Sequence, residues 1–412
     1  MSTHASIGRI YSEPARGPRR TSSQDACRWP LVAVAVAAVA WGANQFAPML
    51  LVYPDELGIS AATAQATFGL YAIGLVPGLL LGGPLSDRRG RRPVLTAALV
   101  ASVLASSLLL AGGSAVGWLF AGRLVAGMAS GAAFSAGSAW IKELAPADFP
   151  GLGARRAVVA MTAGFAVGPL VAGALAEWAP APTVVPYVPH LVIACAGVPL
   201  ALLAPETVIG RPSVARRFSE LRNPRFQHVV APLAPWVFGA AAIPMAYLPG
   251  VVQHRIGDSA LVFGAVVAAL TAAAGIAIQP IARRVDGPDR PRLLIGALSL
   301  VVAGMLIAAD SAADSSPALV VVAAIVLGAA YGALQVCGLL EVQRLAPPTA
   351  LAGMTAVYQA FSYLGFALPF LLAALAGTLA PATGLVLLAA LAALTLAVTA
   401  RASVSDRTEH HA

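Results

Sequence analysis

Charged residues are scarce in this sequence. Only 11% of its 412 residues are Asp, Glu, Lys or Arg, and 58% are hydrophobic, whereas a soluble domain carries about 25% charged residues. The mean hydropathy is +0.80, so many long apolar stretches need lipid as their solvent. The composition excludes a soluble protein and leaves room only for short loops between membrane spans.

Residues that carry enzyme chemistry are also rare. The three cysteines, Cys27, Cys195 and Cys337, are too few and too widely spaced for a disulfide framework or a zinc site. The motifs G-x-x-x-x-G-K-[ST], H-E-x-x-H and G-x-S-x-G do not occur. We therefore expect no enzyme activity, no cofactor and no bound metal, and an ATP-driven pump would need a separate subunit.

Carboxylates are missing from the middle of every apolar stretch. Asp87, Glu177 and Glu341 all lie near the ends of stretches, and His190, at the end of another, has no evident partner in the sequence. The sequence therefore assigns no residue as a proton carrier.

Twelve long apolar stretches follow one another along the chain. One span needs about 20 apolar residues, and the stretches cover about residues 30–52, 63–85, 94–112, 116–138, 157–178, 188–205, 229–252, 260–282, 293–309, 317–340, 352–376 and 383–400. The first is too long for the core of a signal peptide. The sequence predicts an all-α membrane protein with twelve transmembrane helices.

The polar segments divide the chain into two halves. Residues 1–29 are predicted to form a disordered basic tail on the cytoplasmic side, and the longest inner segment, 206–228, a cytoplasmic linker. The linker separates two predicted six-helix bundles, 30–205 and 229–400, and residues 401–412 form a second cytoplasmic tail.

The distribution of the 25 Arg and the single Lys predicts the orientation, because cytoplasmic loops carry the excess of positive charge. With the N-terminus inside, 24 of the 26 basic residues fall on the cytoplasmic side; the others are Arg255, in an outer loop, and Arg123, within a span. The pI near 9.9 therefore reflects membrane topology and not a nucleic-acid partner.

The two halves show internal similarity. Gly164-Phe-Ala-Val-Gly-Pro169 recurs as Gly365-Phe-Ala-Leu-Pro369, an offset of 201 residues at its start. The same offset relates two glycine pairs, Gly127 with Gly328 and Gly131 with Gly332. Such a duplication predicts two pseudo-symmetric bundles around an axis along the membrane normal, with a central site between them.

A charged motif stands between the second and third stretches. It reads Gly83-Pro-Leu85-Ser-Asp87-Arg88-Arg-Gly90-Arg91-Arg92-Pro-Val-Leu95. Gly90 allows a tight turn, and the arginines suit the anionic inner-leaflet interface. The motif resembles the G-x-L-a-D-r-x-G-r-k-x-x-l signature of the major facilitator superfamily. The alternative is a basic topology loop with an incidental Asp.

The resemblance implies that this loop is a conformational latch. In the family, the Asp corresponding to Asp87 docks on the cytoplasmic start of the eleventh helix while the transporter faces outward, and it lets go when the protein opens inward. Here that start is Pro348-Thr-Ala-Leu-Ala-Gly353, whose free amides favour an anion. The second-half loop, 279–286, resembles a decayed copy with Arg283 in place of Asp87, so any latch is asymmetric.

Two further motifs narrow the resemblance. Leu119-Phe-Ala-Gly-Arg123-Leu-Val-Ala-Gly127 resembles the family motif l-x-x-x-R-x-x-q-G, with Ala126 for Gln. Gly164-Phe-Ala-Val-Gly168-Pro169-Leu-Val-Ala-Gly173 resembles the antiport-associated motif g-x-x-x-G-P-x-x-G-G. Together they resemble the twelve-span drug:proton antiporters, which implies that Arg123 serves proton coupling.

Other interpretations of these motifs stay open. A cation within a span costs at least about 2.5 kcal/mol, so Arg123 faces protein, water or a partner; it can also hold an anionic substrate group, or only pack against carbonyls. Gly164, Gly168 and Gly173 allow close helix approach, and Pro169 bends its helix. Close packing with a kink explains that motif as well as antiport does.

Polar and aromatic residues near the middle of the spans are candidates for the substrate site. Each alone is explained by a hydrogen bond between helices or an interfacial anchor, but as a set from both halves they fit a central, mostly apolar pocket. They are Trp41, Asn44, Gln45, Met245, Tyr247, Tyr331, Gln335, Tyr358, Gln359, Ser362 and Tyr363.

The sequence therefore predicts a monomeric secondary active transporter of the bacterial cytoplasmic (inner) membrane. Its partners are the lipid bilayer, a small, amphipathic substrate and, by resemblance, the proton, and it exports the substrate by alternating access. The alternatives are a metabolite uniporter or importer with the same fold, and a membrane receptor or scaffold that transports nothing. The sequence does not identify the substrate.

The topology is testable with reporter fusions. Because basic residues concentrate on one side, fusions at Ser213 and at Ser403 should both report a cytoplasmic location. A signal from the outside at either position would contradict the arrangement of twelve spans.

Overall fold

The structure, a computed structural model, describes residues 27–146, 152–208, 222–287, 292–347 and 351–410. Within these residues the regular structure is helical and there is no β-strand. Most of the predicted tail and linker (residues 1–26 and 209–221) lie outside the described residues, and so do Pro348, Thr349 and Ala350 of the predicted docking site for the latch.

The helices up to residue 203 form what we call the N-terminal half. Short 3₁₀ turns at Ala111–Gly113 and Val185–Tyr187 connect some of them. The helices are α2 (Trp29–Asn44), α3 (Met49–Leu57), α4 (Ala61–Arg89), α5 (Arg91–Leu110), α6 (Val116–Glu143), α7 (Leu152–Trp178) and α8 (Val188–Leu203).

The C-terminal half begins at Phe226. Two π-helical segments, Phe226–Val230 and Ile243–Tyr247, flank its first helix, and 3₁₀ turns lie at Gly257–Ser259 and Leu364–Phe366. The helices are α9 (Ala231–Ala242), α10 (Leu248–Ile256), α11 (Ala260–Ala277), α12 (Gln279–Val285), α13 (Arg292–Ala313), α14 (Pro317–Leu345), α15 (Leu351–Tyr363), α16 (Ala367–Leu375) and α17 (Pro381–His410).

Most of these helices can cross a membrane by length and composition. Among the described residues ten helical segments qualify, or eleven if α2 and α3, which bend by 45° at their junction, form one span. One of the ten is the 60-residue stretch Phe226–Val285, which contains the break at Gly257–Ser259. The prediction of twelve spans treats that stretch as two, and it stays a prediction.

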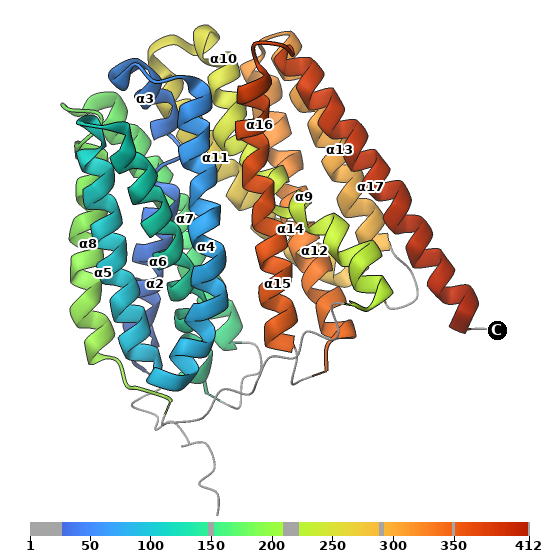
Figure 1. Cartoon of the computed structure of the whole chain (residues 1–412), viewed down its shortest axis with the longest axis horizontal. Coiled ribbons are helices and arrows are strands. Elements are labelled where there is room, and N and C mark those ends of the chain that lie inside the picture. Colours follow the sequence, from blue (N-terminus) through green and yellow to red (C-terminus); the bar gives the residue numbers. More distant parts are fainter. Residues whose placement is uncertain (1–26, 147–151, 209–221, 288–291, 348–350, 411–412) are drawn as a thin grey trace, which may run out of the picture.

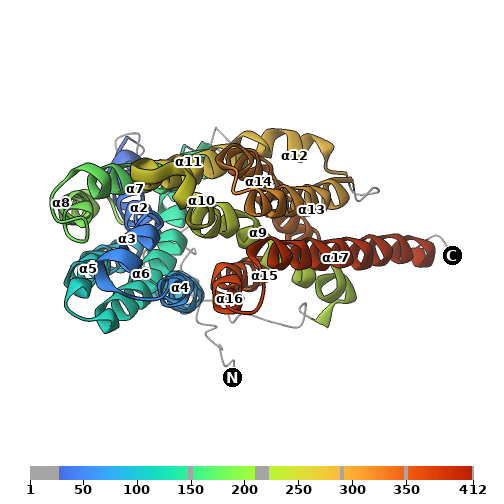
Figure 2. The same cartoon turned by 90° about the horizontal axis from the view of Figure 1, so that it is seen from above.

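The two halves lie side by side (Figures 1 and 2), the N-terminal half in blue to green and the C-terminal half in yellow-green to red. We call the lower end in Figure 1, where α4 and α14 finish, the Arg-rich end, after Arg88, Arg89 and Arg344. The opposite end is the acidic end, after Asp55, Glu177 and Asp258. In Figure 1, α4 and α15 diverge towards the Arg-rich end.

Glycines bring helices together in the same way in both halves. A Cβ on Gly127 or Gly131 of α6 would collide with the backbone of α4, at the carbonyl oxygens of Tyr71 and Leu75. Gly328 and Gly332 of α14 make the matching approach to α11, at the carbonyl oxygens of Thr271 and Gly275. The contacted residues are 200 positions apart and the glycines 201, so the two halves repeat the same helix pairing.

The glycines of the antiport-like motif in α7 pack against two different helices. Gly164 and Gly168 pack against the backbone of α2, where a Cβ on Gly168 would lie 2.8 Å from the carbonyl oxygen of Trp41. Gly173 instead packs across to the C-terminal half, where a Cβ would lie 2.8 Å from Ala265 Cβ and 3.2 Å from the carbonyl oxygen of Leu261 on α11. Pro169 lies inside the helix between these contacts.

Candidate functional site

The charged loop between α4 and α5 forms a compact ion-pair network. Gly90 closes α4 with φ +101°, a conformation that glycine adopts at low cost. Arg91 then turns back, and its guanidinium contacts Asp87 at 2.6 Å, Ser86 Oγ at 2.6 Å and Glu143 of α6 at 2.7 Å. The Asp87 side chain is 48% exposed. In this conformation Asp87 is therefore held by its own loop.

Glu206, just after α8, completes this network. Its carboxylate accepts hydrogen bonds from the backbone N–H groups of Arg91 and Arg92, each at 2.9 Å. These are the free amides at the start of α5, where an anion is favoured. Arg92 donates in return to the carbonyl of Ala204 at 2.7 Å. The loop is thus tied to the end of the sixth predicted span.

The C-terminal half carries a counterpart that the sequence analysis understated. Glu341 of α14 pairs with Arg225 at 2.7 Å and with Arg344 at 2.8 Å, and Arg344 also pairs with Asp286 after α12. Glu341 lies near the end of α14, as Glu143 lies at the end of α6. The loop with Arg283 in place of Asp87 therefore has its own carboxylate, Asp286, engaged by a cation of α14.

Arg123 lies inside the N-terminal half and is 1% exposed. Its guanidinium donates to the carbonyl of Ala43 at the end of α2, at 3.2 Å, and to those of Thr67 and Phe68 on α4, at 3.4 and 3.5 Å. The ring centroids of Phe46 and Tyr71 lie 4.4 and 4.5 Å from it. Carbonyls and aromatic faces, and no described carboxylate, therefore balance this charge.

The two halves meet through an aromatic cluster. The Phe366 ring stacks on Phe238 at 5.2 Å and on Tyr363 at 5.9 Å, within the C-terminal half. Edge contacts join it to Phe68 at 5.2 Å and Tyr71 at 6.2 Å on α4. Phe68 and Tyr71 also flank Arg123, together with Phe46. We call the five rings of Phe68, Tyr71, Phe238, Tyr363 and Phe366 the aromatic gate.

Other contacts between the halves lie towards the acidic end. Gln65 of α4 donates to the carbonyl of Ala246 at 2.5 Å, and Phe46 shares a buried cluster with Ala242 and Ala246. Together with Gly173 against Leu261, these contacts close the acidic end of the interface.

The structure spreads the predicted substrate-site residues over different surroundings. Asn44 donates to the carbonyl of Phe165 at 2.9 Å, and Gln45 to Ser106 Oγ at 3.0 Å, both within the N-terminal half. Tyr358 donates to the carbonyl of Leu334, and Ser362 to that of Tyr358. These four side chains serve helix contacts here, and Met245 and Tyr247 lie in the π-helical segment after α9.

Other predicted residues keep unused polar atoms or join the gate. Trp41 Nε1, Gln335 Oε1 and Gln359 Oε1 are buried without a hydrogen-bond partner among the described residues. Tyr331 and Tyr363 contact Phe238, with centroids 5.6 and 4.3 Å apart. The sequence analysis missed Phe68, Phe238 and Phe366, although the repeat offered one signal, because Phe366 follows Gly365 as Phe165 follows Gly164.

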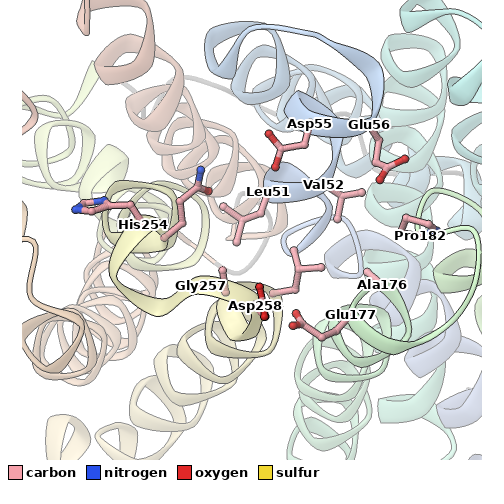
Figure 3. A pocket seen from close by; sticks show the side chains of 13 residues that line it. Leu51, Val52, Asp55, Glu56, Ala176, Glu177, Pro182, His254, Gly257 and Asp258 are labelled. Carbon is pink, nitrogen blue, oxygen red and sulfur yellow. The ribbon is translucent and has the colours of Figure 1, made fainter.

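An acidic pocket of about 540 Å³ lies between the halves at the acidic end (Figure 3). Asp55 and Glu56 of α3 and Glu177 of α7 line it from one side, and His254 and Asp258 from the other. In Figure 3 the Glu177 and Asp258 carboxylates point toward one another. Across the described residues, no group of three or more His, Cys, Asp or Glu is placed to hold a metal ion.

Comparison with known proteins decides the family. Residues 31–370 match the Major Facilitator Superfamily. The chain belongs to this superfamily. It is therefore a multi-pass membrane protein with the major facilitator fold, and its family and fold are those of transporters, not of enzymes. Members of the superfamily bind small-molecule substrates within the membrane. The family match also confirms, at the level of the superfamily, the resemblance seen in the loop motif.

Solved structures support the same fold. The human organic anion transporter MFSD10 (TETRAN) aligns with a TM-score of 0.63 and 18% identity, over 91% of this chain and 99% of that one. A mutant of the nucleoside transporter NupG aligns with a TM-score of 0.70 and 12% identity, over 92% and 99%. At these identities the likeness shows the fold alone.

One relative is similar in sequence over a short region. A protein named chloramphenicol resistance protein, from Pseudomonas aeruginosa, is 45% identical over 65 residues, which is 16% of each chain. The chain thus matches only a small part of that protein's length.

The aromatic gate predicts a specific effect of removing Phe366. Each aromatic pair contributes about 0.5–1.5 kcal/mol beyond its buried area, so Phe366→Ala should raise the fraction of molecules open at the acidic end by about tenfold. Spin labels at Ala61→Cys and Thr378→Cys, in protein without its native cysteines, would report this as longer distances. The control is Phe361→Ala, which removes a ring that is 39% exposed; an equal shift in both variants would contradict the gate.

Proposed function

We propose that this transporter is a secondary active exporter of a small amphipathic molecule, coupled to protons and located in a bacterial cytoplasmic membrane as a monomer with both termini inside. The observation that carries the proposal is the aromatic gate, which closes the acidic end between two halves of repeated design. Alternating access needs such a contact, made and broken at one end of the interface. The name of the short-range relative, which refers to drug resistance, supports export.

The contacts support a conformation closed at the acidic end. The gate and the Gln65 hydrogen bond hold the halves together there, while Asp87 at the other end is paired with Arg91. In the latch hypothesis Asp87 leaves helix eleven, here α15, when the protein opens at the cytoplasmic end. The pairing of Asp87 within its own loop agrees with that state.

The substrate would lie between the halves, beside the gate. Trp41 offers an unused N–H donor from the N-terminal half, and Gln335 and Gln359 offer unused acceptors from the C-terminal half. A few directional contacts among aromatic and apolar surfaces are typical of sites for small molecules. Four other predicted site residues, Asn44, Gln45, Tyr358 and Ser362, would act mainly by holding α2 and α15 in place.

For Arg123 the contacts favour coupling over substrate binding. Its guanidinium is committed to three backbone carbonyls and is almost fully buried, so in this conformation it has no free face for a substrate anion. It also packs on the gate residues Phe68 and Tyr71. A change in the position of Arg123 would therefore alter the packing of these gate residues.

The coupling role is tested with Arg123→Ala. If Arg123 serves coupling, the variant should lose uphill transport driven by a pH gradient in liposomes and keep substrate affinity within a few fold. If Arg123 holds an anionic group, affinity should instead fall by about tenfold or more, since charge-assisted hydrogen bonds are lost. Arg255→Ala, which removes a cation outside the spans, is the control. Wild-type behaviour in both assays would leave only the packing role.

The latch is tested with Asp87→Asn. Loss of a charge–dipole interaction of about 0.3–1 kcal/mol should shift the population about two- to fivefold towards conformers open at the Arg-rich end. Spin labels at Lys142→Cys and Gln343→Cys, at the ends of α6 and α14, would measure it. Asp286→Asn is the matched control, because an asymmetric latch leaves that variant unchanged. Unaltered distances with normal transport would reduce the loop to a topology signal.

The same liposomes test the alternative functions, which are uniport, import and a receptor that transports nothing. Substrate movement without a pH gradient supports a uniporter, and no movement of any solute supports a receptor.

A further inference from the structure

His190, which had no evident partner in the sequence, lies in a buried polar network. The residue is on α8 and is 0% exposed. Its Nδ1 is 2.8 Å from Ser106 Oγ and its Nε2 is 3.3 Å from Ser102 Oγ, both on α5. Ser106 Oγ in turn accepts a hydrogen bond from Gln45 at 3.0 Å. The network therefore connects α8 and α5 to the junction between α2 and α3.

The hydrogen bonds fit a neutral ring. Because Gln45 donates to Ser106 Oγ, the Ser106 hydroxyl hydrogen is free to donate to His190 Nδ1. Nε2 then carries the ring hydrogen and donates towards Ser102, with the Ala38 carbonyl also facing the ring. In this conformation the imidazole needs no second proton.

The surroundings also disfavour a charged ring. On α2 the ring packs against Gly42, where a Cβ would lie 2.8 Å from His190 Cε1. Tyr187, three residues before His190 in the chain, forms a hydrogen bond with Tyr53 on α3. Arg123 of α6 binds the carbonyl of Ala43, the residue after Gly42. No described contact of the ring is a carboxylate, so an imidazolium here would be buried without an anion.

The network reaches a part of the N-terminal half that residues of the C-terminal half help to cover in this conformation. Gln45 lies at the 45° junction of α2 and α3, and its Oε1 is buried without a partner. The cover on this junction comes partly from the C-terminal half, since Phe46 shares a buried cluster with Ala242 and Ala246. When the acidic end opens this cover is lost, and an unpaired acceptor such as Gln45 Oε1 is where water enters first.

We propose that His190 is the proton-binding residue of the conformation that is open at the acidic end. In that conformation a hydronium ion at the α2–α3 junction transfers its proton to Nδ1 and becomes water. The Ser106 hydroxyl then turns from donor to acceptor, and the two serine oxygens accept the two ring N–H groups. Closure returns the proton to water, since the closed network holds the neutral ring. Only an N–H bond is made and broken.

Proton binding to one conformation alone makes the equilibrium depend on pH. Below the ordinary titration range of histidine, about pH 6.5, each further pH unit should raise the ratio of open to closed molecules by up to about tenfold. The inference rests on the proposed function only in requiring two conformations; it does not require that transport be proton-coupled.

The experiment uses the full chain in nanodiscs, without native cysteines and with spin labels at Ala61→Cys and Thr378→Cys. Between about pH 8 and pH 5 the long-distance population should grow, and His190→Gln should abolish this growth. The control is His254→Gln, which removes a histidine of the acidic pocket (Figure 3). A wild-type pH response in His190→Gln, or its loss only in His254→Gln, would overturn the proposal.

A second variant covers a folding failure of His190→Gln. Ser106→Ala keeps the imidazole but removes the acceptor for its Nδ1–H, so the response should persist with its midpoint moved to lower pH. An unmoved midpoint contradicts the proposal. Solute uptake by the same protein in liposomes is measured separately. A pH response that depends on His190, without solute uptake, would refute the proposed function and leave this inference standing. Solute uptake without a pH response that depends on His190 would refute this inference and leave the proposed function standing.

Discussion

The close approach of helices through glycine is the contact on which the rest of this structure depends. In lipid the backbone must satisfy its own hydrogen bonds, and apolar side chains gain little by leaving lipid for each other. Helices then hold together where small residues bring their backbones into contact. Gly127 and Gly131 do this for α6 and α4, and Gly328 and Gly332 for α14 and α11. Each half therefore holds together through backbone contacts of its own.

That interface uses different chemistry at its two ends. At the acidic end, aromatic rings such as Phe366 meet the N-terminal half face to edge, and such contacts separate without leaving a charge unpaired. At the Arg-rich end, the ion pairs of Arg91 and Arg344 are made within each half, so separation of the halves breaks none of these pairs. Gly173 is the exception among the motif glycines, because it packs across the interface. Gly173 therefore contributes a close helix contact to the interface between the halves.

Local patterns predicted the fold well and the site only in part. The apolar stretches, the turn at Gly90 and the 201-residue offset predicted helices, a loop and a repeated helix pairing, because each depends on neighbours in the sequence or on a second copy of it. The break between α2 and α3 lies within a continuous apolar stretch and gave no such signal. The Glu206 cap on α5, the Asp286 pair with Arg344 and the Phe366 contacts join residues far apart in the chain. Only the fold brings these partners together, so no spacing rule reveals them.

The break between α2 and α3 also explains how a cation can be buried without an acid. A helix that stops inside the membrane leaves carbonyls without their usual partners and a negative dipole end. Arg123 takes one of these carbonyls, at Ala43, and the His190 ring packs on the adjoining residue, Gly42. Both basic groups thus contact one helix end. Because Arg123 also flanks Phe68 and Tyr71, the helix end, the two basic residues and the aromatic gate form one connected unit, in which electrostatics can set the position of the gate without any carboxylate in the membrane interior.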